Sequence, residues 1–310
     1  MMLLGSIGAA ACSHEKRPAP ATAASTVADA GSAPKTEAEP PAPRPAEPPE
    51  PVRTALGLRG SELFIPSWFT THGGRYDLVV HFHGEGRWQE QNVERAKLNV
   101  AVVSVNLGMG TPPYSNAFKD PEVFERLLAD VEAEVTKSRG EAKLGRLALS
   151  AWSAGFSSIS RIMSDTTADR VDAVLLADGF FTNFKNVRKR TINTAGLERW
   201  TRFSQAARKN EKLFAITHTT IPTGPYPSVQ ECVGKLLELE SIRRKPCSID
   251  GPRPKMHQFY KVDEGSFHIA GFHGKLAADH VRQLHAMGET TYPYLKERWE
   301  KQDAEETAAR

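Results

Sequence analysis

Ser153 is the residue whose surroundings best suit nucleophilic chemistry. It follows an apolar stretch, 147–152, and precedes a run of small residues and phenylalanine, 154–158. The sequence therefore predicts a strand that turns sharply into a helix at this serine. Residues 151 and 155 are alanine and glycine, and small side chains there allow a strained turn that exposes the hydroxyl. Ser153 is a candidate nucleophile for attack on a carbonyl carbon.

A serine nucleophile needs a base that accepts its proton and a carboxylate that orients the base. Asp178 follows a branched, apolar stretch, 171–177, which reads as a buried strand. Catalytic and ligand-binding groups gather at the carboxyl ends of such strands. Asp178 is therefore the candidate acid, and a turn or helix-capping aspartate is the alternative.

Two histidines near the carboxyl terminus qualify as the base. His280 lies near the start of a helix predicted from about residue 277, where the first turn is anchored. His273 ends the predicted strand segment 267–273 and is followed by glycine. We favour His280 and keep His273 as the alternative.

The remaining pattern predicts the scaffold that these groups need. Apolar stretches at 76–82 and 98–107 read as strands, and a proline-initiated, amphipathic helix follows from residue 121 to Gly140. The stretch ending at Ser153 comes next. Strands that alternate with helices in this way predict a parallel sheet.

Together these motifs resemble the α/β-hydrolase superfamily over roughly residues 54–299. The likeness rests on the serine between small residues and on a His-Gly turn two strands upstream of it, although Ala151 stands where the family usually has glycine. The resemblance implies a three-layer α/β/α sandwich with a central, mostly parallel sheet.

The resemblance also implies an oxyanion hole, a pair of backbone N–H donors for the negative charge that develops on the substrate oxygen. Each donor is worth roughly 3 to 4 kcal/mol. We expect one donor at Ala154 and the other at Glu85 or Gly86. The upstream loop comprises His83, Gly84, Glu85 and Gly86.

In many family members the acid follows a later strand than the one before Asp178. In this chain that later stretch, 213–218, is followed by no carboxylate until Glu231. This absence favours Asp178, because the imidazole needs a carboxylate partner.

The activity that the resemblance implies is that of an exported serine hydrolase. It would cleave a small or polymeric ester, in preference to an amide, through an acyl-enzyme and without a cofactor. A tethered binding domain that keeps the scaffold without the chemistry is the alternative, since fold does not establish function.

The amino-terminal segments suggest export. Residues 1–12 resemble a lipoprotein signal that ends at Cys12, the residue to be lipidated, and an apolar amino terminus without that function is the alternative. Residues 13–53 are rich in Pro and Ala, which predicts a disordered tether. We expect a hydrolase domain over 54–300, a flexible tail over 301–310, and a periplasmic or outer-membrane location.

Charge and composition exclude other classes of partner. The 310 residues carry a net charge of +3 with both signs interspersed, which gives no signature of nucleic-acid binding. No stretch of about eighteen apolar residues exists, so we expect membrane contact only through the lipid anchor. The oligomeric state has no signal in the sequence.

The cysteines and paired histidines bear on disulfides and metals. Cys232 and Cys247 could close a loop of about fifteen residues, worth on the order of 3 kcal/mol, and two unrelated thiols are the alternative. His81 and His83 alternate along a predicted strand, but no further ligands are apparent nearby, so we expect no metal site.

Overall fold

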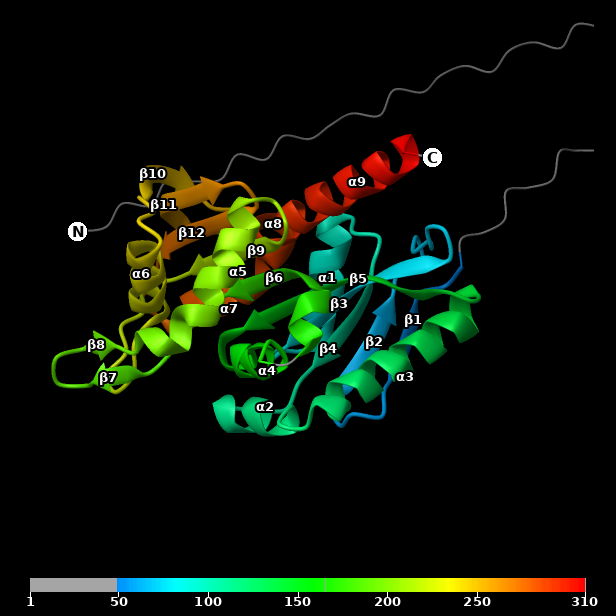
Figure 1. Ribbon diagram of the computed structural model, residues 1–310, viewed down its shortest axis with the longest axis horizontal. Coiled ribbons are helices and arrows are strands. Elements are labelled where there is room, and N and C mark those ends of the chain that lie inside the picture. The colour runs from blue at the N-terminus through cyan, green and yellow to red at the C-terminus, as the bar shows by residue number, and fades with distance from the viewer. Residues whose placement is uncertain (1–48, 165, 310) are drawn as a thin grey trace, which may run out of the picture. The chain divides into compact units, whose positions relative to one another are not determined.

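The computed structural model of the protein describes residues 49–164 and 166–309 (Figure 1). The predicted signal with Cys12 and the tether up to residue 48 lie outside the described residues. Ten strands form one sheet in the order β1-β2-β4-β3-β5-β6-β9-β12-β11-β10, and β7 and β8 form a small hairpin. The strands are β1 Val52–Ala55, β2 Ser61–Ile65, β3 Arg75–Phe82, β4 Ala101–Val105, β5 Lys143–Trp152, β6 Val171–Ala177, β7 Phe184–Asn186, β8 Thr191–Ile192, β9 Leu213–His218, β10 Lys245–Asp250, β11 His257–Glu264 and β12 Phe267–His273.

The middle of the sheet is parallel. Strands β4, β3, β5, β6, β9 and β12 pair in parallel, whereas β1 and β2 at one side and β11 and β10 at the other pair antiparallel. The central strands are apolar on both faces because helices cover both faces. The predicted mostly parallel sheet is confirmed.

Helices cover the two faces of this sheet and complete three layers (Figure 1). Apolar side chains of α3, α4, α5 and α6 share one core cluster, and those of α1, α7, α8 and α9 share a second. The helices are α1 Gly86–Ala96, α2 Thr111–Ala117, α3 Pro121–Arg139, α4 Phe156–Ile162, α5 Glu198–Arg208, α6 Val229–Leu239, α7 Ala277–His285, α8 Met287–Thr290 and α9 Tyr292–Ala308, with short 3-10 turns η1 Ser153–Gly155, η2 Thr166–Arg170 and η3 Thr194–Leu197.

The structure corrects both expected ends of the domain. Strand β1 begins at Val52, because Val52 pairs with Ile65 of β2. We expected a flexible tail over 301–310, but α9 continues to Ala308. Residues 301–308 contain no helix breaker, and Asp303 forms an ion pair with Arg146 of β5 at 2.9 Å.

The predicted disulfide is also wrong, because Cys232 and Cys247 are free thiols. Cys232 lies on the inner face of α6, fully buried in the core. Cys247 lies on the edge strand β10, and its Sγ is 3.8 Å from the carbonyl oxygen of Gln258 on the neighbouring strand. The inward-facing helix position and the edge strand do not bring the two thiols together.

Within the described ranges, no helix has both the length and the apolar character that crossing a bilayer requires.

Candidate active site

Ser153 stands at a strained turn between β5 and α4. Its φ is +50°, in the left-handed region that few non-glycine residues adopt. Close packing on both sides holds this turn. A Cβ on Gly155 would lie 2.0 Å from the carbonyl oxygen of Phe82, and a Cβ on Gly179 would lie 2.8 Å from the Ser153 nitrogen. Glycine at these two positions lets the neighbouring backbone approach the serine.

Asp178 follows β6 directly, is 5% exposed and has a φ of +47°. Thr219, the residue after β9, donates its N–H to Asp178 Oδ1 at 2.9 Å and its hydroxyl to Oδ2 at 2.7 Å. The Asp178 N–H in turn donates to the carbonyl oxygen of Thr217. The carboxylate is therefore fixed between two neighbouring strand ends.

His280, in the first turns of α7, contacts the same carboxylate. Its Nδ1 lies 2.7 Å from Asp178 Oδ2. A carboxylate only accepts hydrogen bonds, so Nδ1 carries the proton and donates it, and Nε2 is left as the acceptor. Burial raises the pKa of Asp178, but the hydrogen bonds and charge of His280 and the Thr219 donors outweigh it and hold the pKa below its usual value.

His273, the alternative base, lies in a different cluster. Its ring stacks on Phe259 at a centroid distance of 4.6 Å and on His257 at 5.8 Å. These partners belong to β11, the antiparallel neighbour of β12. Of the two candidate histidines, His280 is the one that the structure brings to Asp178.

The loop after β3 carries two residues with positive φ, His83 at +76° and Gly84 at +105°. The His83 N–H donates to the carbonyl oxygen of Val105, so it is not free for a ligand.

Helix α1 begins at Gly86, with Glu85 as its N-cap. The first N–H groups of a helix have no partner within it, which suits Gly86 as a donor toward a developing negative charge. Ala154, on the other side, is 8% exposed.

A buried polar network around His81 holds this loop through the His83 carbonyl oxygen. His81 Nε2 lies 2.9 Å from the His83 carbonyl oxygen, and His81 Nδ1 lies 2.9 Å from the Ser150 hydroxyl. The carbonyl can only accept, so Nε2 carries the proton and Nδ1 accepts from Ser150. Burial lowers the pKa of His81 to about 3. Neutral His81 thus fixes the direction of the His83 carbonyl.

The strand order, the strained serine after β5 and the chain order of Ser153, Asp178 and His280 decide the fold class. The chain has the α/β-hydrolase fold. No protein-family model matches the chain, and no curated protein is similar to it in sequence.

Several solved structures resemble the chain at low identity. A poly(3-hydroxybutyrate) depolymerase from Bordetella parapertussis is 12% identical, with a TM-score of 0.44 over 77% of this chain and 88% of that one. A feruloyl esterase module from Clostridium thermocellum is 12% identical, with a TM-score of 0.46 over 79% and 87%. An acetyl xylan esterase from Aspergillus awamori is 14% identical, with a TM-score of 0.42 over 73% and 93%.

The Ser153 hydroxyl has no hydrogen-bond partner among residues 49–164 and 166–309, so no hydrogen bond joins it to His280 in this structure. Hydrogen bonds between a nucleophile and its base are often long before substrate binds. The fold thus brings the candidate acid Asp178 and the candidate base His280 into contact and leaves the Ser153 hydroxyl free.

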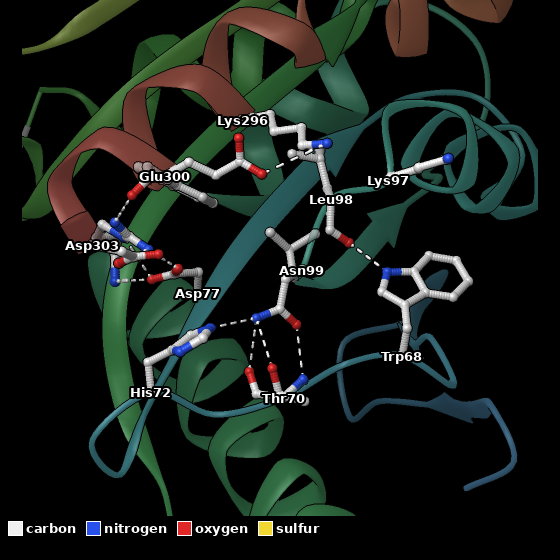
Figure 2. A pocket seen from close by; sticks show the side chains of 13 residues that line it. Trp68, Thr70, His72, Asp77, Lys97, Leu98, Asn99, Lys296, Glu300 and Asp303 are labelled. Carbon is white, nitrogen blue, oxygen red and sulfur yellow. Dashed lines mark hydrogen bonds and ion pairs between the residues drawn. The ribbon is translucent and has the colours of Figure 1, made fainter. Parts of the chain in front are cut away.

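A pocket of about 320 Å³ lies at the amino ends of the strands, whereas Ser153 stands at their carboxyl ends (Figure 2). It is lined by residues near the amino ends of the strands, such as Asp77 and Asn99, and by α9. Several of its polar groups bond one another: Arg146 donates to Asp77, and Asn99 donates to the Thr70 carbonyl oxygen. The pocket lies between α9 and the sheet, and its lining contains none of the candidate catalytic residues.

Metal-binding clusters are absent from the described part of the chain, where no group of three or more His, Cys, Asp or Glu residues is arranged to hold an ion. His81 and His83, which alternate along the strand, make separate hydrogen bonds to Ser150 and to the Tyr114 hydroxyl.

Sequence reasoning missed three side chains at this site. Thr219 holds Asp178, Tyr114 bonds His83 at 2.7 Å, and Trp152 contacts two histidine rings. Thr219 had a signal, because it stands at the strand end where the family often has its acid. Tyr114 and Trp152 had none beyond their proximity to the motifs.

Proposed function

We propose that this protein is a serine hydrolase that cleaves carboxylic esters through an acyl-enzyme. The observation that carries the proposal is the hydrogen bond between His280 Nδ1 and Asp178, next to a serine in a strained turn. This bond leaves His280 Nε2 as the acceptor that a base needs. Asp178 is ionised at neutral pH, because its pKa lies below the usual value.

The reaction follows from these roles. Ser153 Oγ attacks the ester carbonyl while its proton passes to His280 Nε2, and the carbonyl oxygen becomes an oxyanion held by Ala154 and the loop donors. The C–O bond breaks, and His280 returns the proton to the departing alcohol. Water then attacks the acyl-enzyme with His280 again as base, which releases the acid and restores Ser153.

Esters are the first substrates to test, because an alcohol leaves with less proton assistance than an amine does. Exposed apolar side chains favour an apolar substituent on the ester. Met109 is 87% exposed, Leu276 68% and Val281 36%. Met109 and Leu276 lie in the connections that follow β4 and β12, and Val281 lies in α7, the helix after β12. Ser153 stands at the same carboxyl ends of the strands. Apolar area of this kind gains roughly 25 cal/mol per Å² when a substrate covers it.

Hydrolysis of p-nitrophenyl acetate and butyrate by the full chain tests the proposal. We expect turnover by the wild type and loss of essentially all of it in Ser153→Ala. Ser160→Ala, in the same helix α4, is the control and should keep wild-type turnover. Equal turnover by the wild type and Ser153→Ala would contradict the proposal.

A tethered binding domain without catalysis is the second candidate. The free Ser153 hydroxyl and Ala151 in place of the usual glycine favour it. Failure of the wild type to turn over any ester would support this candidate.

We also propose that residues 1–12 direct export and that Cys12 receives a lipid, so that the domain acts at a membrane surface in the periplasm. Incorporation of labelled palmitate into the wild type and not into Cys12→Ser is the expected result. Equal incorporation, or none in either, would contradict lipidation at Cys12.

A further inference from the structure

We infer that Trp152 is a positioning residue that aligns the base and the oxyanion loop with Ser153. It is the residue immediately before the nucleophile, and its indole contacts both His280 and His83. This inference rests on the proposed function, because it assigns Trp152 a part in the same reaction.

Trp152 holds His280 in two ways. Its ring lies 4.7 Å from the imidazole, centroid to centroid, at an interplanar angle of 34°. Its Nε1–H also donates to the His280 carbonyl oxygen at 3.0 Å. One contact fixes the side chain of the base and the other fixes its backbone, so the imidazole has little freedom to turn away from the serine.

The same indole contacts the oxyanion loop. The His83 ring stacks on it at 4.8 Å with an interplanar angle of 9°. His83 is anchored from its other side, because its Nδ1 lies 2.7 Å from the Tyr114 hydroxyl. A shift of Trp152 would therefore move the loop and the base together.

The sheet fixes Trp152 itself. Trp152 ends β5 and pairs in register with Ala177, which ends β6. Ser153 follows the first of these residues and Asp178 follows the second. The indole thus projects from the one register pair that also sets the spacing of the nucleophile and the acid, and His280 approaches from a different element, α7.

The electrostatics agree with this role. Burial, and secondarily the charge of His280, lower the pKa of His83 to about 4, so His83 is neutral at pH 7. The imidazolium that forms on His280 during reaction then faces no second cation on the loop. An indole face attracts a cation through its negative π-face. Trp152 therefore favours the charged intermediate as well as the geometry.

The test compares Trp152→Leu, Trp152→Phe and a matched control, Trp88→Leu. The Trp88 ring lies 3.8 Å from the His285 ring, centroid to centroid, so it is a tryptophan that packs on a histidine of the same helix, α7, but not on His280. Each variant is assayed for kcat and KM on p-nitrophenyl butyrate, and the His280 ring protons are observed by NMR. A residue misplaced by about 1 Å costs on the order of 10²-fold in rate.

We expect kcat to fall at least tenfold in Trp152→Leu, with KM within about twofold of wild type, and the His280 ring protons to move downfield as the indole ring current is lost. Trp152→Phe should recover part of kcat, because it keeps a ring but loses the N–H donor. Trp88→Leu should keep kcat and the His280 resonances.

Two results would overturn the inference. One is wild-type kcat in a folded Trp152→Leu, and the other is an unchanged His280 resonance in that variant. Failure of the proposed function looks different. The wild type would then be inactive, and the resonance shift in Trp152→Leu, absent in Trp88→Leu, would still report whether Trp152 holds His280.

Discussion

His280 Nδ1 donates a 2.7 Å hydrogen bond to Asp178 Oδ2, across 102 residues of sequence. The carboxylate is already held by the backbone N–H and the hydroxyl of Thr219. Three separate elements therefore meet here: Asp178 follows β6, Thr219 follows β9, and His280 lies near the start of α7. Its chemical consequence is a fixed imidazole tautomer with Nε2 available as an acceptor.

Replacing this carboxylate tests the consequence. In Asp178→Asn the amide can donate to Nδ1, which favours the wrong tautomer, and we expect ester turnover to fall on the order of 10⁴-fold. Asp279→Asn is the control, because Asp279 lies beside His280 in sequence but accepts from the N–H groups of Lys275 and Leu276 instead. Its turnover should stay close to wild type. Comparable losses in both variants, measured as kcat/KM, would contradict the assignment of Asp178.

Gly155 makes a second prediction, on stability. Gly155→Ala puts a methyl group 2.0 Å from the Phe82 carbonyl oxygen. Because that oxygen is a backbone atom, the backbone would have to move to make room for the methyl group. We expect a loss of about 3 kcal/mol or more in the free energy of unfolding, from urea titration. Gly224→Ala is the control, because a Cβ there meets nothing within 4 Å. It should change the free energy by no more than about 0.5 kcal/mol. Equal stabilities of the two variants would be incompatible with the close approach at Gly155.

Buried His81 predicts how stability depends on pH. Burial lowers its pKa from 6.5 to about 3, so between these values the unfolded chain binds a proton that the folded chain does not. The free energy of unfolding therefore falls as the pH falls, by about 1.4 kcal/mol per pH unit for one such histidine. In His81→Gln the slope between pH 4 and pH 6 should be shallower by about that amount. Above pH 7 the free energies of unfolding of the wild type and of His81→Gln should depend on pH in the same way. An identical acid slope in the variant, measured by urea unfolding, would rule out a neutral, buried His81.

The sequence predicted the parts of the site that depend on local pattern. The turn at Ser153 was predictable because a strand, a serine and small residues follow one another in the chain, and the structure places that turn directly after β5. The place of Asp178 directly after a buried strand was predictable from the apolar stretch before it. The sandwich and its mostly parallel sheet followed from the alternation of strands with helices, and the structure confirms them.

Contacts between distant elements were beyond that reasoning. Whether His273 or His280 meets Asp178 depends on how α7 packs, and Trp152 meets His83 and His280 only once β3, β5 and α7 are assembled. The predicted disulfide failed for the same reason, since spacing does not show that Cys232 faces the core. The expected tail failed because an acidic, polar segment can also continue a helix, as α9 does.

The most direct test of the account is covalent labelling of Ser153. A fluorophosphonate reacts with a serine that a neighbouring base activates. We expect wild-type protein to gain one phosphonate adduct, which peptide mass spectrometry should locate at Ser153, and Ser153→Ala to gain none. Wild-type protein without an adduct, or an adduct that persists in Ser153→Ala, would contradict the claim that this chain is a serine hydrolase.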